Sequence, residues 1–213
     1  MATVLNSYIN ASAAPASVTL VGSSYVSNAA TSGIPYPAGT TAGDIAMYIN
    51  VSTSGGGTLI SGWSGGSAGI GSGGMQTNMS HGRKVLVSGD LVGGSLTGFT
   101  QNGPGLLVVY RNGSAVAVKT TTMVPTDPDT GFPLSDVTFS TSFTKGTGSK
   151  KLINLFLSTV SLTTITAPFT AQLSTSSYVH SDADSSSYTS GDTLTTSWSN
   201  SDYRMAQATF EIT

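Results

Sequence analysis

Apolar and polar residues alternate in short runs along this chain, and that spacing limits it to β-structure. Residues 45–52, 137–144 and 207–213 place apolar side chains at every second position, with mostly small or polar residues between them. A period of two puts one face of a strand in a core and the other in a polar environment. No long stretch shows the i, i+3, i+4, i+7 spacing of an amphipathic helix. The pattern predicts an all-β protein.

Two further runs, at residues 106–110 and 152–157, are almost continuously apolar and are typical of central strands covered on both faces. Turn residues separate the runs, as in the Asn-Gly pair at 112–113. Short strands with this punctuation indicate antiparallel sheets in a sandwich or barrel. Weaker strand signals occur at residues 18–21, 85–87, 96–100, 115–122 and 169–173.

Three segments lack the alternation. Residues 1–17 form an arm of small residues that we expect to act as an anchor or interface, while 18–213 form one domain. The Gly- and Ser-rich stretch 55–74 contains scattered apolar residues, so it is interpreted as an ordered long loop with a strand end inside it. Residues 174–190 are polar and aperiodic, which predicts an exposed loop.

The chain also shows one order of features twice. Ser88-Gly89-Asp90 precedes an aromatic residue and a closing apolar strand, and Ser190-Gly191-Asp192 does the same. The two halves span about 36–113 and 145–213. One half alone has too few strands to be stable, so we expect pseudo-repeated halves that each contribute to both sheets and share one core.

Charge is scarce: only 8% of the 213 residues are charged, where a soluble domain usually has about a quarter. The eight Lys and Arg are scattered and the net charge is −2, so no nucleic-acid partner is expected. Cysteine is absent, which excludes disulfides and thiolate chemistry. We expect neither a signal peptide nor membrane insertion. A neutral, hydrogen-bonding surface without an export signal suits a particle assembled in a host cytoplasm and released by lysis.

One segment resembles half of a calcium-binding loop. Asp127 and Asp129 stand at alternate positions before a glycine, and Asp136 is the one later carboxylate that could complete the ligand set. A Pro/Asp/Gly turn explains the same residues without a metal. We expect no cofactor.

The chain contains two histidines, His81 and His180, and they are its only candidates for a histidine general base. His180 lies just before two Asp residues in a Ser-rich segment, and these are the residue types of acyl transfer. No spacing identifies a partner serine, so both histidines are predicted to lie on the surface. The sequence predicts no enzyme.

Aromatic residues fall into two groups. Those beside strand ends are expected in the core: Trp63, Trp198 and Phe99. Exposed tyrosines can stack on the apolar face of a sugar while nearby polar groups bind its hydroxyls. The candidates for a ligand or interface contact are Tyr25, Tyr178, Asp182, Asp184 and Tyr188.

Short motifs occur in a fixed order: Pro37–Met47 with its Gly-Asp, Ser61-Gly62-Trp63, Arg83-Lys84-Val85 and Leu107–Gly113. Together they resemble a β-sandwich module of tailed bacteriophages and bacterial surface proteins. Those modules have Gly-Asp before an apolar strand, then Ser-Gly-Trp, then a strand ending in Tyr-Arg-Gly. This chain departs from the pattern at Gly55–Gly57, where the family is Pro-rich, and at Arg111-Asn112-Gly113. The resemblance implies a jelly-roll-like two-sheet sandwich in a structural or adhesive part of a phage particle.

Three functions of different classes follow. The first is a structural component of the virion (capsid decoration, head fibre or tail protein) that packs against other virion proteins and forms a homo-oligomer. The alternative is a carbohydrate-binding or host-adhesion module with a host glycan as ligand. A remote alternative is a hydrolase, which needs a histidine and a serine, or two carboxylates, to meet in a pocket. We expect no such convergence.

Overall fold

The computed structural model describes residues 16–52, 59–70, 77–100, 102–123, 137–158, 169–174, 178–200 and 205–213. Within them the chain forms fourteen strands, and the fold is all-β, as the sequence predicts. The first seven are β1 (Thr19–Val26), β2 (Ile34–Pro35), β3 (Ile45–Ser52), β4 (Ser64–Ile70), β5 (Thr77–Val85), β6 (Ser95–Leu96) and β7 (Gly105–Arg111). Helix α1 (Ala29–Ser32) precedes β2, and a 3-10 turn, η2 (Ser88–Leu91), follows β5.

The second half continues with the other seven strands. They are β8 (Val116–Met123), β9 (Val137–Thr144), β10 (Lys151–Ser158), β11 (Thr170–Ser174), β12 (Tyr178–Asp184), β13 (Thr193–Asn200) and β14 (Met205–Ile212). A 3-10 turn, η3 (Ser185–Ser187), follows β12. The described helices have three or four residues, far fewer than a bilayer-crossing helix needs.

The two halves have the same strand order. The first half forms a five-stranded sheet, β1-β7-β3-β5-β4, and pairs β2 with β6. The second forms β8-β14-β10-β12-β11 and pairs β9 with β13. The 3-10 turn also recurs at the same place, after the fifth strand. The predicted pseudo-repeat is therefore present in the topology.

Each half is jelly-roll-like. Its first strand pairs with its last, its second with its sixth and its third with its fifth, all antiparallel. This nested pairing is typical of jelly rolls. The expectation that each half contributes to both sheets is wrong, because each half builds one five-stranded sheet of its own. The approximate bounds predicted for the halves do not include β1 in the first half or β8 and β9 in the second.

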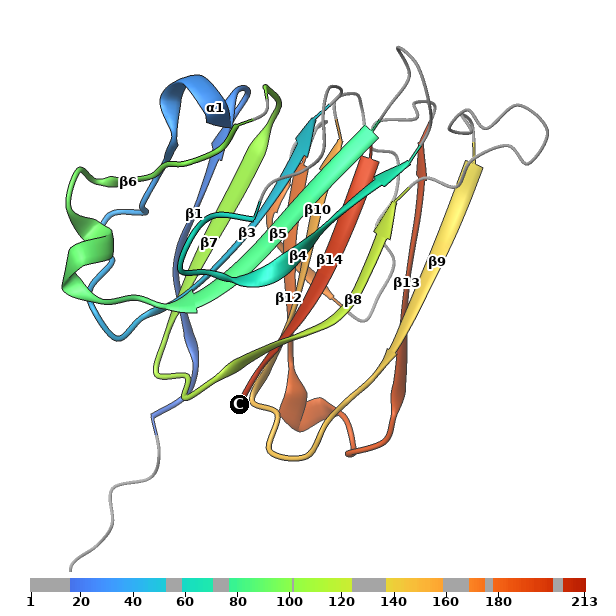
Figure 1. Ribbon diagram of the computed structural model, residues 1–213. Helices are drawn as coiled ribbons and strands as arrows, with labels where there is room; N and C mark the ends of the chain where they lie inside the picture. Colours follow the sequence, from blue (N-terminus) through green and yellow to red (C-terminus); the bar gives the residue numbers. More distant parts are fainter. Residues whose placement is uncertain are drawn as a thin grey trace, which may run out of the picture.

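Figure 1 shows the resulting layers from left to right: β2–β6, the two five-stranded sheets, and β9–β13. The large sheets pack face to face around one shared core, with side chains from β3, β5, β7, β10 and β14. Its buried members are Val18, Ile45, Met47, Ile49, Val51, Met79, Leu106, Val108, Tyr110, Ile153, Leu155, Leu157, Ala206, Ala208, Phe210 and Ile212. The halves thus share one core, as the sequence indicates.

The outer layers bury the other faces of the large sheets. On the first sheet, Trp63 and Phe99 pack edge-on against Tyr48, at ring distances of 5.2 and 5.4 Å. Both are 7% exposed, which confirms their predicted core positions. On the second sheet, Phe143 of β9 packs against Leu152 of β10. The side chain of Trp198 lies outside the described part of the structure, so its core position stays a prediction.

Alternation predicts a polar environment on one face of strands 45–52 and 207–213, yet every residue of β3 and β14 is buried. The outer layers cover their polar face, where hydrogen bonds engage some of the buried side chains, although the hydroxyl of Ser52 has no partner. Gln207 donates to Asn154 at 2.7 Å, and Asn50 donates to the carbonyl oxygen of Pro104 at 2.9 Å. Polar residues at alternate positions therefore mark a buried hydrogen-bonded face here.

The predicted loop at 174–190 is wrong. Its residues include β12, which pairs with β10 on one side and β11 on the other. The long loop predicted at 55–74 also contains a whole strand, β4, rather than a strand end. Both strands escape sequence reasoning because Ser, Gly, His and Asp replace the apolar residues that reveal a period.

Candidate functional site

Four polar side chains form a continuous hydrogen-bonded chain between the two large sheets. Ser23 of β1 lies 2.7 Å (Oγ) from Nδ1 of His180 in β12. The other ring nitrogen of His180, Nε2, lies 2.8 Å from the hydroxyl of Tyr110 in β7. That hydroxyl donates to Asp182 Oδ2 at 2.5 Å. The chain crosses the sandwich along the flank where β1 faces β12.

Strand geometry brings these groups together. Residues two apart on a strand share a face, so Tyr178, His180 and Asp182 all point toward the first sheet. Ser23 and Tyr25 share the inward face of β1 in the same way. Tyr25 stacks on Tyr178 with ring centroids 4.0 Å apart and a 16° angle between the planes. The flank is therefore closed by an aromatic pair beside the hydrogen-bonded chain.

The direction of each hydrogen bond follows from Tyr110. Its proton goes to Asp182, so its oxygen accepts from Nε2–H of His180, and Nδ1 accepts from the Ser23 hydroxyl. Burial lowers the pKa of His180 to about 4, although Asp182 raises it. Burial, and then Asp182, raise the pKa of the Tyr110 hydroxyl far above its usual value. Both groups are neutral near pH 7.

A cavity of about 340 Å³ lies at the Asp182 end of this chain. Its volume falls in the lower range of small-molecule sites, about 300–1,000 Å³. Its lining carries two carboxylates, an ammonium, an amide, hydroxyls and one aromatic ring. The lining residues are Lys151, Thr170, Gln172, Asp182, Ala183, Asp184, Ser187 and Tyr188.

Asp182 is held from three sides. Besides Tyr110, Gln172 Nε2 donates to its Oδ1 at 2.9 Å, and Lys151 Nζ lies 3.6 Å from Oδ2. Asp182 is 5% exposed, whereas Asp184, two residues on, is exposed and points to the same face of β12. The cavity therefore combines one fixed carboxylate with one that is free to contact solvent. Tyr188 is partly buried and packs against the apolar cluster that includes Phe143 and Ala183.

A second cavity, of about 280 Å³, adjoins the described start of the chain. Ala16 and Ser17 line it together with Asp184 and Lys150. Asp184 thus lines both cavities. Residues 1–15 of the predicted arm lie outside the described residues, so its role as an anchor or interface stays a prediction.

The predicted ligand residues separate into two places. Asp182, Asp184 and Tyr188 meet at the first cavity. Tyr25 and Tyr178 meet each other on the flank, partly buried against the shared core. Sequence reasoning missed Lys151 and Gln172, which sit on strands it had identified but carry no recognisable motif.

Both histidines are buried, which corrects their predicted surface positions: His180 is 0% and His81 8% exposed. They occupy equivalent places in the repeats, since His81 of β5 pairs with Ile49 of β3 and His180 of β12 pairs with Leu155 of β10. Sequence analysis missed both positions because their neighbours are polar or small: Ser80 and Gly82 flank His81, and Ser181 and Asp182 follow His180.

The expectation that no two carboxylates meet in a pocket is wrong, because Asp182 and Asp184 both line the first cavity. Ser23 and His180 are hydrogen-bonded to each other. The pair has the contact of a nucleophile with its base. However, the His180 ring is fully enclosed, and neither of the two cavities is lined by Ser23 or His180. The hydrogen bonds of Ser23 and His180 fix the positions of their protons. Neither of the two cavities would bring an acyl substrate to this pair.

The predicted calcium ligands Asp127, Asp129 and Asp136 lie outside the described residues. Within the described segments, no three His, Asp or Glu side chains gather as a metal site would require. Comparison with family models, curated proteins and solved structures finds no match to this chain.

Proposed function

We propose that this protein is a structural component of a bacteriophage virion, as a capsid decoration, head fibre or tail protein, and that it acts through protein–protein packing. The observation that carries the proposal is that most of its few described charged side chains are bonded to other groups of the fold. Lys150, Asp184 and Asp192 remain exposed, but the charge that the surface carries is small, and an exterior rich in Ser, Thr, Asn and Gly lets neighbours make close contact.

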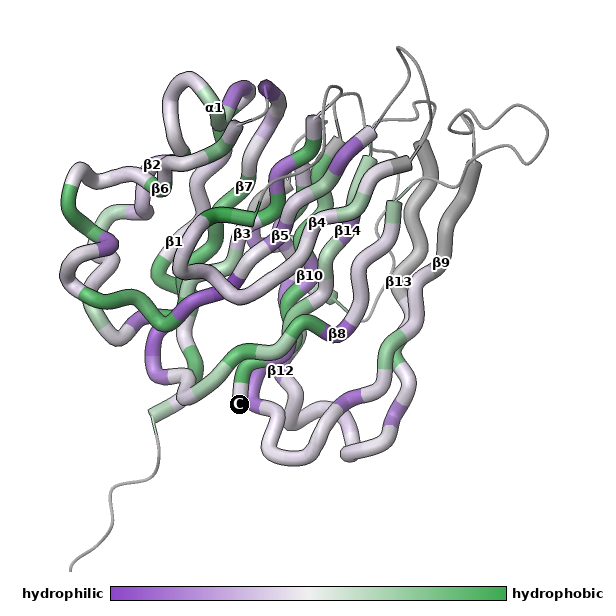
Figure 2. Tube along the Cα trace, in the orientation of Figure 1, coloured by the Kyte–Doolittle hydropathy of each residue, from purple (hydrophilic) through white to green (hydrophobic). Residues whose placement is uncertain are grey.

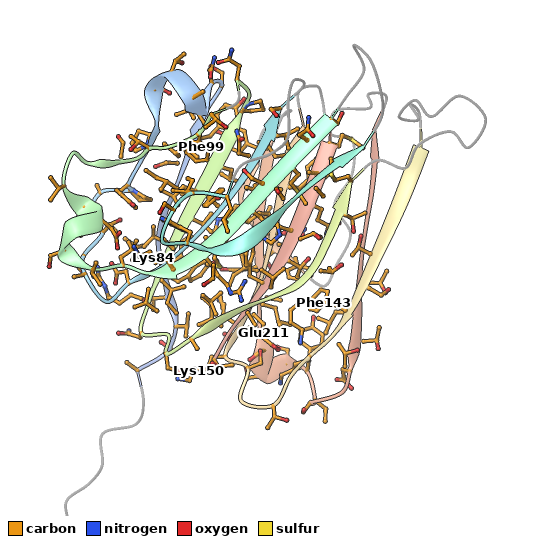
Figure 3. The ribbon with its side chains drawn as sticks, in the orientation of Figure 1. Lys84, Phe99, Phe143, Lys150 and Glu211 are labelled. Carbon is orange, nitrogen blue, oxygen red and sulfur yellow. The ribbon has the colours of Figure 1, made fainter. Side chains whose placement is uncertain are left out.

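Four ion pairs illustrate this use. Lys84 contacts Asp90 at 2.5 Å, Arg111 contacts Asp44 at 2.8 Å, Lys119 contacts Glu211 at 3.1 Å and Lys151 contacts Asp182 at 3.6 Å. Figure 3 labels Lys84 beside the first sheet and Glu211 beside the second. The side chains of Asp44, Glu211 and Asp182 are at most 6% exposed, so these carboxylates form their ion pairs inside the fold.

Two further cations bind backbone carbonyls. Arg83 Nε donates to the carbonyl oxygen of Val116 at 2.8 Å and links β5 to β8. Lys145 Nζ donates to the carbonyls of Ser185 and Tyr188. A protein whose net charge is near zero tends to associate, and symmetric copies make many weak contacts sufficient. Both properties suit a repeated particle component.

The test is the protein content of purified particles of the phage that encodes the chain. Quantitative mass spectrometry should find its peptides at a fixed ratio to the major capsid or tail protein. Particles from a phage that carries a deletion of the gene should lose density at one repeated position in a reconstruction. Absence of the peptides from intact particles would overturn the proposal.

A second candidate function, carbohydrate binding in host adhesion, is favoured by the cavity at Asp182, Asp184 and Tyr188. A sugar presents an apolar face and a ring of hydroxyls, and the cavity offers a tyrosine among carboxylate, amide and ammonium groups. We expect Asp184→Asn to weaken glycan binding about tenfold. Asp192→Asn, a matched change in an exposed acid outside both cavities, should leave binding unchanged. A glycan array without any signal from the wild-type protein contradicts this second function.

A further inference from the structure

The two halves of the repeat differ at the cavity beside Asp182. Counting on from the equivalent histidines, Asp182 and Asp184 of β12 correspond to Arg83 and Val85 of β5. In Figure 2 the tube is green, the hydrophobic colour, where β5 leads into η2. These two positions hold carboxylates in one half and none in the other, so the shared fold does not itself require them.

Lys151 also departs from the repeat. It lies opposite Asp184, whereas the equivalent pair in the first half is Ile45 with Val85. Opposite charges at facing positions stabilise an antiparallel pair of strands. The Lys151 ammonium nevertheless lies 3.6 Å from Asp182 Oδ2, and none of the ion pairs among the described residues includes Asp184. Asp184 is therefore an exposed carboxylate without the cation that its strand position would supply.

A β-bulge adds the amide group that fixes Asp182. β11 shifts register around Gln172, whereas its counterpart β4 pairs with β5 without a shift. Bulges re-aim side chains and are frequent beside functional sites. Gln172 Nε2 donates to Asp182 Oδ1 at 2.9 Å, while Tyr110 and Lys151 engage Oδ2. Asp182 is thus occupied within the fold, and Asp184 is the carboxylate of this cavity that a ligand can reach.

The remaining lining of the cavity is mostly neutral and polar. Thr170, Gln172 and Ser187 bring hydroxyl and amide groups, and Tyr188 brings a partly buried ring. Lys145 holds the backbone of this ring in place by donating to the carbonyl oxygen of Tyr188. A sugar matches such a lining, because its hydroxyls bind polar groups and its apolar face packs on an aromatic ring.

We propose that this cavity binds a sugar that carries a free amino group, with the ligand ammonium on Asp184. The inference rests on the second candidate function, carbohydrate binding, and names the class of sugar. Two carboxylates against one ammonium give the lining an excess of negative charge, and Asp182 already has its cation in Lys151. The ammonium of an amino sugar completes the pair that Asp184 lacks, which a neutral sugar cannot do.

Three probes separate the charge of the ligand from its ring: glucosamine, N-acetylglucosamine and glucose. Titrations followed by ¹H–¹⁵N NMR near pH 6, where the amine is protonated, should give glucosamine an affinity about tenfold above the other two. The resonances that shift should belong to β12 and η3. Asp184→Asn should lower the affinity for glucosamine to that for glucose. Asp192→Asn, the matched change in an exposed acid outside both cavities, should keep the preference.

Equal affinities of the wild type for the three sugars would overturn the inference and leave carbohydrate binding intact. Ethylamine that binds as tightly as glucosamine would also overturn it, because the amine alone would then account for the affinity. A preference that survives in a folded Asp184→Asn protein would place the ammonium elsewhere, with the same consequence. If no sugar binds here or on the glycan array, carbohydrate binding itself fails. Particle mass spectrometry tests the virion function separately.

Discussion

Tyr110 is the residue through which His180 and Asp182 are joined. Its hydroxyl accepts from one and donates to the other, and all three residues are at most 5% exposed. A buried polar group that loses its partner costs more than the bond itself contributes, because water cannot replace the partner. The hydrogen-bonded chain therefore makes the flank between β1 and β12 specific as well as stable.

Tyr110→Phe should lower the free energy of unfolding by about 2–3 kcal/mol. It leaves Nε2–H of His180 without an acceptor and removes a donor from Asp182. Urea denaturation at pH 7.5 measures the change. Tyr36→Phe is the control, since that tyrosine is only partly buried and water can hydrate its hydroxyl; it should change stability by less than about 0.5 kcal/mol. Equal effects of the two substitutions would contradict the assigned hydrogen bonds.

The stability of the protein should fall as the pH falls from about 6.5 to 4. Burial lowers the pKa of His180 to about 4, and the unfolded chain titrates near 6.5, so the unfolded state binds more protons in that window. The loss reaches about 3 kcal/mol at its acid end. Burial also lowers the pKa of His81, which adds to the same slope.

Denaturation curves collected at half-unit pH intervals measure this slope. His180→Gln should flatten the slope of stability against pH, because glutamine does not titrate. From pH 7 to 8, residue 180 should contribute no pH dependence to the stability of the wild type or of the variant. Asp44 acts at more acidic pH. Burial raises its pKa, but hydrogen bonds from Arg111 and Thr41 outweigh burial and lower it, so its contribution is lost only below about 4. A wild-type slope that persists in His180→Gln assigns the effect to other groups.

At the scale of elements, strands with apolar alternation could be predicted and strands of small or polar residues could not. β3, β7, β9, β10 and β14 match the predicted runs closely. β12 buries His180, Ser181 and Asp182, which read as solvent-exposed residues in the sequence. His180 and Asp182 are buried against partners from β1 and β7, and such distant contacts leave no local pattern in the sequence. The sequence predicts no cavity, but three of its candidate ligand residues, Asp182, Asp184 and Tyr188, line one because they share one segment; their role in binding stays a prediction.

The close approach of β4 to β5 gives a prediction for this element. A Cβ at Gly65 would stand 2.0 Å from the carbonyl oxygen of His81, so Gly65→Ala must push the strands apart. We expect a loss of about 1–3 kcal/mol, as for other overpacked sites. Gly89→Ala is the control, because a Cβ at Gly89 meets nothing within 4 Å. Thermal denaturation compares the two, and an unchanged midpoint for Gly65→Ala would show that β4 lies further from β5.

At the scale of the molecule, the repeat and the shared core have opposite consequences. Each half has its own nested strand pairs and its own outer layer, which favours independent folding. The apolar inner faces of β3 and β10, however, are buried only against the opposite sheet. A half that unfolded would expose Ile153, Leu155 and Leu157, or Ile45, Met47 and Ile49, to water at a cost of roughly 1.5–3 kcal/mol for each large side chain. We therefore expect the shared core to outweigh the independence of the halves, so that the two halves unfold together.

The two tryptophans allow this coupling to be measured, since Trp63 lies in the first half and Trp198 in the second. Trp198→Phe leaves fluorescence from the first half alone, and Trp63→Phe leaves it from the second. In each variant, urea curves from fluorescence and from far-UV circular dichroism should coincide, because the shared core makes unfolding all-or-none. Leu155→Ala, which removes a buried side chain of the second sheet, should shift the Trp63 signal by about 2–5 kcal/mol although Trp63 lies in the other half. If Leu155→Ala left the unfolding curve from Trp63 fluorescence unchanged, the halves would unfold separately.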